Sequence, residues 1–388
     1  MDFATSPEAL AFRDEVRALL ERTFTPEVRE QMHHTGTLHN WGIHHALGEA
    51  GWLQQALPES LGGGGRDPEE LAGLFREFEL AGAPYDGISN VVMISSVLAH
   101  MGNEMQKRDV LPKLLSGEAV AALGYSEPDS GSDVAAARTT AVRDGDGWRI
   151  NGAKMFTSVA EEATWALMLT RTNPDVPKHK GLTFFLVPLD RDGVEIQPVF
   201  TLSGKRTNAT FYDDVFVEDE WRVGDVDQGW QVMLVALSYE RGVAGGVRDA
   251  ERLLVNAEAF ARDTLDADGR PLIEQPAWRE ALANLAVDVE VADLLAGRAA
   301  WVSGSGKLPG TEGAHVKLFA TEAVTRAANA FMDLAGPEGV ERGDPHDDRA
   351  RIFEYFYRFA PVATIYGGTS EIQRNLVAQR GLGLPRGR

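Results

Sequence analysis

A glycine-rich stretch near the C-terminus combines residue types and spacing that suit chemistry. Residues 363–375 read ATIYGGTSEIQRN, with two glycines before Thr369 and Ser370. The spacing of Ser370 and Gln373 matches a capping box, which predicts that a helix begins here. Unpaired N–H groups at a helix N-terminus suit an anionic or carbonyl ligand, and a plain helix start with a flexible entry is the alternative.

Two earlier stretches place hydroxyl groups beside glycine or an aromatic ring. The first, LGYSEPDSGSD, offers hydroxyls and close backbone approach to a polar ligand, through Tyr125, Ser126, Ser130, Gly131 and Ser132. The second, NGAKMFTSVA, offers a ring that can pack on a flat ligand and hydroxyls that can bond the ligand's edge, through Phe156, Thr157 and Ser158. An ordinary turn is the alternative for each stretch.

Glu240 is a carboxylate within an apolar stripe of a predicted helix. Ala236 and Leu237 lie one turn before it, and Val243 and Ala244 lie one turn after it. Residues at these spacings share one helix face. A carboxylate removed from water has a raised pKa and can act as a base near neutral pH. A buried salt bridge is the structural alternative.

Histidines cluster near the N-terminus, at His33, His34, His39, His44 and His45. No pair of histidines or carboxylates there has the spacing of a zinc-hydrolase motif. We therefore expect these residues to occupy a solvated helix face or loop, and we predict no metal site.

The composition limits the classes of protein that remain. The chain has 388 residues, 44% hydrophobic and 25% charged, which is typical of a globular protein with two or three domains. A net charge of -20 disfavours binding to nucleic acid or to an anionic membrane. The absence of cysteine excludes disulfides and thiolate sites. No apolar run has the length of a membrane span, and the N-terminus does not read as a signal peptide. We expect a cytoplasmic protein.

The spacing of apolar residues changes twice along the chain. Residues 1–118 have helical spacing, whereas residues 119–224 hold short β-branched and aromatic runs with a hairpin turn predicted at 144–147. Residues 225–388 predict four long helices, the first through 229–265 and the last beginning at Ile372. The predicted fold class is α+β, with an N-terminal α-helical domain, a middle antiparallel β domain and a C-terminal four-helix bundle.

Together and in this order, these stretches resemble the acyl-CoA dehydrogenase family over nearly the whole chain. YSEPDSGSD and KMFTS are similar to the two flavin loops of that family, and IYGGTSEIQRN with GLGLP is similar to its C-terminal signature. The resemblance implies an FAD cofactor and an acyl-CoA substrate that is oxidised to trans-2-enoyl-CoA. A base removes the α-proton, and the β-hydrogen leaves as hydride.

The resemblance also implies roles for individual residues. The residues expected at FAD are Tyr125, Ser126, Gly131, Ser132, Phe156, Thr157, Ser158, Thr369 and Glu371. The Gly367 N–H is expected to bond the thioester oxygen and to stabilise the enolate, as an oxyanion hole does. Many members carry the catalytic glutamate at the Gly367 position, but one branch places it on the long helix before an arginine. That pair is Glu240–Arg241 here, so Glu240 is the predicted base. Arg241 and Ser132 are expected near the substrate.

Further departures from the family concern assembly. Leu265 and Asp268 occupy the places of an arginine and a phenylalanine that usually reach a neighbouring subunit's FAD, and Asp333 replaces a common glutamine. Either Arg262 or Arg270 holds the outer half of FAD, or an unlike partner does. The resemblance implies a homo- or heterotetramer, an electron-transfer flavoprotein or similar acceptor, and lipid β-oxidation of bulky esters such as sterol side chains. The alternatives are a non-catalytic or FAD-sharing subunit, and a flavin monooxygenase or nitroalkane oxidase on the same fold.

Overall fold

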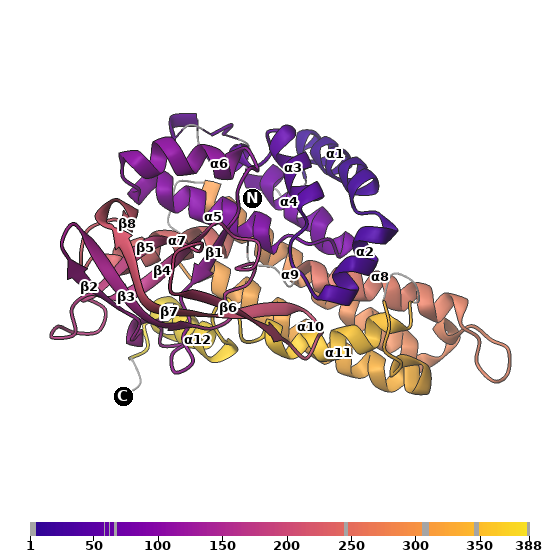
Figure 1. Ribbon diagram of the computed structural model, residues 1–388. Helices are drawn as coiled ribbons and strands as arrows, with labels where there is room; N and C mark the ends of the chain where they lie inside the picture. Colours follow the sequence, from indigo (N-terminus) through magenta and orange to yellow (C-terminus); the bar gives the residue numbers. More distant parts are fainter. Residues whose placement is uncertain are drawn as a thin grey trace. The chain divides into compact units, whose positions relative to one another are not determined.

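The computed structural model describes residues 5–57, 59–61, 63–65, 68–243, 247–304, 310–344 and 349–385 (Figure 1). The chain forms two compact units, each with its own hydrophobic core. We call Asp14–Leu71 with Pro84–Glu240 the sheet unit. We call Met1–Arg13, Ala72–Ala83 and Arg241–Arg388 the bundle unit. Within the described ranges, no helix has both the length and the apolar character needed to cross a bilayer.

Helices form the first part of the sheet unit. Helix α5, Asp86–Met101, is buried on most sides, as expected for a helix with apolar residues all round, and it packs against β1 and α6. The side chain of Asn40 caps α3 by accepting a hydrogen bond from Ile43 N at 3.0 Å. The other helical elements are α2 (Pro26–Thr35), α3 (Trp41–Glu49), η1 (Gln54–Ala56), η2 (Glu59–Leu61), η3 (Gln106–Val110), α6 (Leu111–Leu115), η4 (Val134–Ala136), η5 (Asp219–Trp221) and α7 (Gly229–Val243), which belongs to the bundle unit from Arg241 onward. Helices α1 (Pro7–Thr23) and α4 (Pro68–Ala81) each begin in one unit and end in the other.

An eight-stranded sheet follows, in the order β6-β7-β3-β2-β4-β5-β8 with β1 beside β4. Its strands are β1 (Ala121–Gly124), β2 (Thr140–Asp144), β3 (Gly147–Lys154), β4 (Trp165–Arg171), β5 (Leu182–Pro188), β6 (Val194–Phe200), β7 (Arg206–Glu218) and β8 (Arg222–Val223). The predicted hairpin is confirmed, because Asp144 pairs with Gly147 and Gly145 has a φ of +58°. Strands β4 and β5 are buried along their length, which accounts for their continuous apolar sequences.

The sheet is mixed, whereas the sequence predicted an antiparallel one. Strand β1 pairs with β4 in parallel, and Thr140 of β2 makes a parallel contact with Arg171 of β4. Only a tight hairpin forces neighbouring strands to be antiparallel. Long connections join β1 and β2 to β4, so their direction is set by packing, which short-range sequence patterns do not report.

The bundle unit contains four packed helices, α8 (Val247–Asp263), α9 (Pro276–Gly304), α10 (Glu312–Gly339) and α11 (Arg351–Ala363), with a short turn η6 (Leu272–Glu274). Aromatic rings from all four meet in its core. Phe260 of α8 lies 5.6 Å from Trp278 of α9, ring centroid to ring centroid, and Phe353 of α11 lies 5.9 Å from Phe331 of α10. These contacts join the helices into one core.

The fourth helix of the bundle is α11, not the C-terminal stretch that the sequence analysis assigned to it. Ile352, Phe353, Phe356 and Phe359 recur at helical spacing and are buried, so the sequence does carry the pattern of this helix. The C-terminal stretch forms only the short helix α12, Ser370–Leu376, and the turn η7, Val377–Gly381. The helix expected through 229–265 is described as α7 and α8, and residues 244–246 between them lie outside the described part.

Candidate functional site

The two loops predicted from the middle of the chain lie side by side in the sheet unit. The first begins where β1 ends, and the second begins where β3 ends. The backbone N–H of Met155 donates to the carbonyl oxygen of Ser126 at 2.9 Å, which joins the two loops directly. The strand ends therefore bring the predicted residues of both loops into one region of the sheet.

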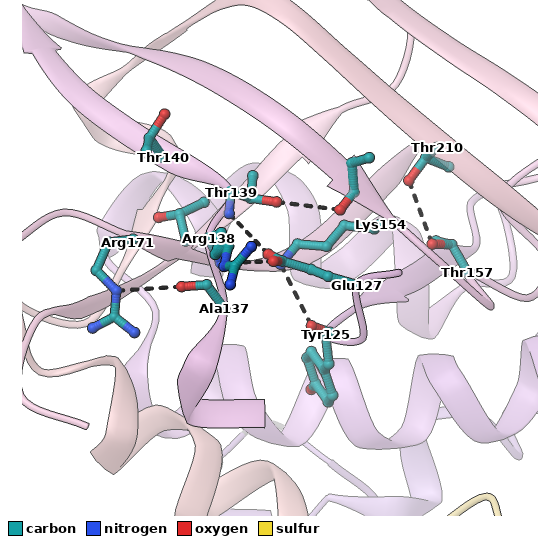
Figure 2. A network of polar contacts seen from close by, with 12 residues as sticks. Tyr125, Glu127, Ala137, Arg138, Thr139, Thr140, Lys154, Thr157, Arg171 and Thr210 are labelled. Atoms are coloured by element: carbon teal, nitrogen blue, oxygen red, sulfur yellow. Dashed lines mark hydrogen bonds and ion pairs between the residues drawn. The ribbon is translucent and has the colours of Figure 1, made fainter. Parts of the chain in front are cut away.

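Glu127 of the first loop and Lys154 at the end of β3 form a buried ion pair (Figure 2). Lys154 Nζ lies 2.7 Å from Glu127 Oε1 and donates to the carbonyl oxygen of Tyr125 at 3.4 Å. Glu127 also accepts hydrogen bonds from the backbone N–H groups of Arg138 at 2.6 Å and Thr139 at 2.9 Å. Neither charged residue was among the predicted site residues. A signal was available, because Lys154 is the only cation in NGAKMFTSVA and Glu127 is the first acid in LGYSEPDSGSD.

The charges of this pair persist at neutral pH because each group compensates the other. Burial lowers the pKa of Lys154 to about 8, and the neighbouring Glu127 carboxylate limits that fall. Burial raises the pKa of Glu127, but the charge of Lys154 and the hydrogen bonds outweigh it and leave the pKa below its usual value. Lys154 is fully buried, so its partner is the main source of its stabilisation.

The first loop offers an unsatisfied hydroxyl and open space. Glu127 and Ser130 exchange backbone hydrogen bonds at 2.8 and 3.1 Å, which holds the turn. The Oγ atom of Ser130 is buried and finds no hydrogen-bond partner among the described residues. Nothing lies within 4 Å of the position that a Cβ would take at Gly131, and Ser132 beside it is exposed. A buried polar group is normally hydrogen-bonded, so this loop fits a polar ligand.

The second loop presents an exposed ring next in sequence to one buried and one partly buried hydroxyl. Phe156 has a φ of +60° and is 62% exposed. Thr157 is buried, with Oγ1 3.4 Å from Thr210 Oγ1, and Ser158 Oγ lies 3.0 Å from Thr207 Oγ1. The 3.4 Å contact is long for a hydrogen bond between two hydroxyl groups, so it is weak. This arrangement fits the flat ligand that the sequence predicted.

The C-terminal loop, in the bundle unit, begins its helix earlier than predicted. Helix α12 starts at Ser370 rather than at Ile372, and its cap is Thr369, whose Oγ1 accepts from Ile372 N at 3.2 Å. Threonine at the N-cap satisfies an end N–H group, so the cap moves one residue before the predicted Ser370. Gln373 Nε2 donates to the carbonyl oxygen of Gly367 at 2.8 Å and holds the loop against the helix.

Backbone conformation limits what can stand at Gly367. Gly367 and Gly368 have φ values of +61° and +85°, a region that side chains other than glycine rarely adopt. Next to them, Glu371 has a pKa below its usual value because it bonds backbone N–H and the Thr369 hydroxyl. The Oγ atom of Ser370 is buried and has no hydrogen-bond partner among the described residues. The loop therefore exposes backbone rather than a carboxylate at position 367.

The predicted base and its neighbour lie where the structure describes only the backbone. Glu240 and Arg241 belong to α7, and the side chains of residues 238–243 lie outside the described part, as do residues 244–246. Glu240 is the last residue of the sheet unit, and Arg241 begins the C-terminal segment of the bundle unit. The roles of both residues stay predictions.

The histidine cluster is partly buried, which corrects the expectation of a solvated face. His44 is 0% exposed, and the ring centroids of His39 and His44 lie 4.9 Å apart. Burial lowers the pKa of His39 to about 3 and that of His44 to about 4. Their rings pack with Trp41, so His44 on α3 and His39 just before α3 both face the protein interior. Among the described residues, no group of metal-ligating side chains has the geometry of a metal site.

Protein-family models cover nearly the whole chain in the predicted order. The N-terminal domain of acyl-CoA dehydrogenase matches residues 6–118, its middle domain matches 122–215, and its C-terminal domain matches 227–382. The chain belongs to the acyl-CoA dehydrogenase family. It is an oxidoreductase, and the predicted fold class is confirmed at the level of the family.

Relatives within the acyl-CoA dehydrogenase family match from end to end. Acyl-CoA dehydrogenase FadE26 of Mycobacterium tuberculosis is 32% identical over 402 residues, covering 100% of this chain and 99% of the relative. The crystal structure of the ChsE4-ChsE5 complex of Mycobacterium tuberculosis contains a chain with a TM-score of 0.89 and 31% identity, covering 100% of both chains. A structure described as the Tcur3481-Tcur3483 steroid ACAD gives the same TM-score of 0.89, identity of 31% and coverage of 100%.

Local ion pairs surround the positions where this acyl-CoA dehydrogenase departs from the family's FAD contacts. Leu265 is 59% exposed, in the turn after α8. Arg270 Nη2 lies 2.9 Å from Asp268 Oδ2, and Arg262 Nη2 lies 2.6 Å from Glu258 Oε1. Both arginines that were candidates for the outer half of FAD therefore already pair with acids on their own segment.

Proposed function

We propose that this chain is an FAD-dependent dehydrogenase that converts an acyl-CoA thioester to the trans-2-enoyl-CoA. The observation that carries the proposal is the pair of joined loops in the sheet unit, with a free buried Ser130 hydroxyl and an exposed Phe156 ring, in a chain of this family. We also propose the division into three domains, at residues 1–118, 119–224 and 225–388.

In this proposal, FAD supplies the hydride acceptor when it is bound. Phe156 packs on the flavin ring system, while Thr157 and Ser158 bond its edge and Tyr125 and Ser126 approach it. Gly131 and Ser132 take the pyrophosphate or the substrate, where the first loop has open space. Thr369 and Glu371 complete the set from the C-terminal loop.

The proton chemistry falls to residues of α7 and of the C-terminal loop. Glu240 removes the α-proton of the thioester, and Arg241 orients Glu240 or the CoA end. The backbone N–H of Gly367 donates to the thioester oxygen, which stabilises the enolate as negative charge develops. The left-handed backbone of Gly367 supports this division, because a side chain there would be strained.

We propose bulky acyl groups, of the sterol side-chain kind, as the substrate class. The support is the likeness to a structure described as a steroid ACAD. We further propose a tetramer, with an unlike partner that helps to hold FAD and an electron-transfer flavoprotein or similar acceptor. Helix α9 supports assembly, because Val287, Leu294 and Trp301 form an exposed apolar stripe at seven-residue spacing.

A panel of acyl-CoA esters with an artificial electron acceptor tests the proposal. Straight-chain, branched and steroid side-chain esters are compared, with the purified protein alone and with co-expressed partner chains. The expected result is acceptor reduction that tracks enoyl-CoA formation, with the highest kcat/KM for the bulky esters. Oxygen incorporation, or nitroalkane oxidation without acyl-CoA turnover, would favour the monooxygenase or oxidase alternative instead. Stable FAD-free protein with no turnover would favour a non-catalytic subunit.

A further inference from the structure

The second loop holds two residues in a conformation that they rarely adopt. Phe156 has a φ of +60° and Val159 a φ of +68°. Bulky and β-branched side chains are strained in this region, and such strain persists only where the surrounding structure over-determines it. Contacts from the rest of the fold must therefore hold this part of the loop. The segment between the two strained residues consists of Thr157 and Ser158.

Asn208 of β7 contacts that segment through both its backbone and its side chain. The carbonyl oxygen of Asn208 accepts from Thr157 N at 2.8 Å, and Asn208 Nδ2 donates to Thr157 O at 3.0 Å. Both peptide groups of Thr157 are thus satisfied by one residue. Asn208 is fully buried, so these bonds are shielded from water.

The rest of the Asn208 amide is also occupied. Asn208 Nδ2 donates to Glu161 Oε2 at 2.5 Å, and Oδ1 accepts from Arg206 Nε at 3.2 Å and Nη2 at 3.1 Å. Arg206 Nε also lies 3.6 Å from Glu161 Oε1. A fully satisfied buried network fixes one geometry, because every alternative leaves a polar group unpaired.

Contacts from the N-terminal helical part of the sheet unit support the outer side of this network. Arg206 N donates to the carbonyl oxygen of Gly36 at 2.7 Å. The indole Nε1 of Trp41 donates to Glu162 Oε2 at 2.8 Å. The loop is thus held at Thr157 by Asn208 and at its far end by residues 161 and 162.

We propose that Asn208 is a positioning residue that holds residues 156–158 in their strained conformation before the cofactor binds. This inference rests on the proposed function, in which that segment contacts FAD. Ordering the loop in advance means that cofactor binding does not have to supply the ordering, which strengthens affinity. Asn208 itself is buried and acts through Thr157.

The test compares substitutions at two buried amides of the sheet unit. Asn208→Asp replaces a donor with a carboxylate oxygen that faces Thr157 O and Glu161, and Asn208→Ala removes the amide while keeping the backbone bond. The matched control is Gln106→Glu, because Gln106 is also fully buried and donates to the carbonyl oxygens of Glu220 at 3.0 Å and Arg222 at 3.1 Å. Hydrogen exchange of residues 155–160 in the apoprotein and the Kd for FAD are measured for each variant.

Both Asn208 variants are expected to exchange residues 155–160 at least about tenfold faster and to weaken FAD binding by a similar factor, since two hydrogen bonds are lost. Gln106→Glu is expected to lower Tm while leaving both quantities near the wild-type values. Unchanged exchange and Kd in a folded Asn208→Ala protein would overturn the inference, as would equal effects from the control. If Asn208→Asp does not fold, Asn208→Ala decides the question.

Relief of the strain provides an independent check. Glycine accepts the backbone conformation of Phe156 without penalty. In a Phe156→Gly background, Asn208→Ala is therefore expected to change exchange of the loop much less than it does in the wild type. An equal change in both backgrounds would show that Asn208 does not hold the strained conformation. Hydrogen exchange of the apoprotein reports on Asn208 even if the wild type binds no FAD. Failure of the proposed function can therefore be told apart from failure of this inference.

Discussion

At the scale of single residues, the proposal assigns proton removal and the contact to the thioester oxygen to two different positions. Position 367 is glycine with a φ of +61°, and the predicted base is Glu240 on α7. Glu240→Gln is expected to retain FAD and bind acyl-CoA but to lose kcat by on the order of 10² to 10⁴, because general-base catalysis is removed. Stopped-flow reduction of the flavin measures this step.

Near-normal flavin reduction by Glu240→Gln would remove Glu240 from the mechanism. The double change Glu240→Gly with Gly367→Glu is expected to restore only a small part of the activity. The new side chain would be strained at a left-handed backbone position, and displacement by about 1 Å can cost a hundredfold in rate. Gly367→Ala, with a small strained side chain, is the matched control.

The ion pair of Lys154 and Glu127 is expected to be strongly coupled. Lys154→Met and Glu127→Gln each leave the partner buried and uncompensated, so each is expected to lower the free energy of unfolding by about 3 to 5 kcal/mol. The double variant is expected to lose less than the sum, because neither charge is then left alone. Urea unfolding of the apoproteins measures the cycle.

The matched control for this cycle is Arg191 with Glu218, whose Nη2 and Oε2 atoms lie 2.7 Å apart and whose side chains are 34% and 38% exposed. Exposed pairs contribute about 0 to 1 kcal/mol, so Arg191→Met with Glu218→Gln is expected to show little coupling. Additive effects at Lys154 and Glu127 would contradict the interpretation that these two groups compensate each other.

At the scale of elements, α3 and the segment before it make the sheet unit sensitive to acid. The pKa values of His39 and His44 are about 3 and about 4, below the usual 6.5, so the unfolded chain takes up protons first as the pH falls. Their contribution to stability is complete above pH 6.5 and is lost as the pH falls from about 6.5 toward 4 for His44 and toward 3 for His39. Between pH 7 and pH 5, the free energy of unfolding is expected to fall by about 2 kcal/mol per histidine.

Urea unfolding of the wild type and of His39→Leu and His44→Leu at pH 7 and pH 5 checks this expectation. Each leucine variant removes one titrating group and is expected to show a smaller fall on acidification. His33→Asn, at an exposed position on α2, is the control and is expected to leave the fall unchanged. A fall that is identical in all four proteins would show that other groups dominate the acid response.

At the scale of the whole molecule, the FAD content of the purified protein tests whether the chain needs an unlike partner. Leu265 cannot bind a pyrophosphate, and Arg270 and Arg262 are paired with Asp268 and Glu258. Charge-assisted contacts from arginine are the usual means of holding such a group. The protein expressed alone is expected to contain less than one FAD per chain, and co-expression with an unlike partner is expected to raise the ratio.

Flavin absorbance with light scattering measures the FAD content and the mass of the assembly together. A homotetramer that holds four tightly bound FAD molecules with full activity would end the proposal of an unlike partner, while the dehydrogenase assignment would stand. Leu265→Arg is a useful companion variant. A rise in FAD content when that variant is expressed without a partner would show that the missing arginine is the reason for weak FAD binding.

Local patterns in the sequence were sufficient for the fold class, the hairpin at Asp144–Gly147 and the family. Hydrophobic period, turn residues and short motifs each report on neighbours within a few positions, so they could predict that two loops with hydroxyls and rings exist. They also carry the pattern of α11, in the spacing of Ile352, Phe353, Phe356 and Phe359.

Only the tertiary structure decided what holds those loops. Glu127 and Lys154 are 27 residues apart in the sequence, and Thr157 and Asn208 are 51 apart. The burial of His39 and His44 and the parallel pairing of β1 with β4 also depend on segments that are distant along the chain. The sequence does not show whether a charged, amide or imidazole side chain faces water or a partner inside the protein. Their partners are chosen when the sheet and helices pack, because burial makes an unpaired polar group costly.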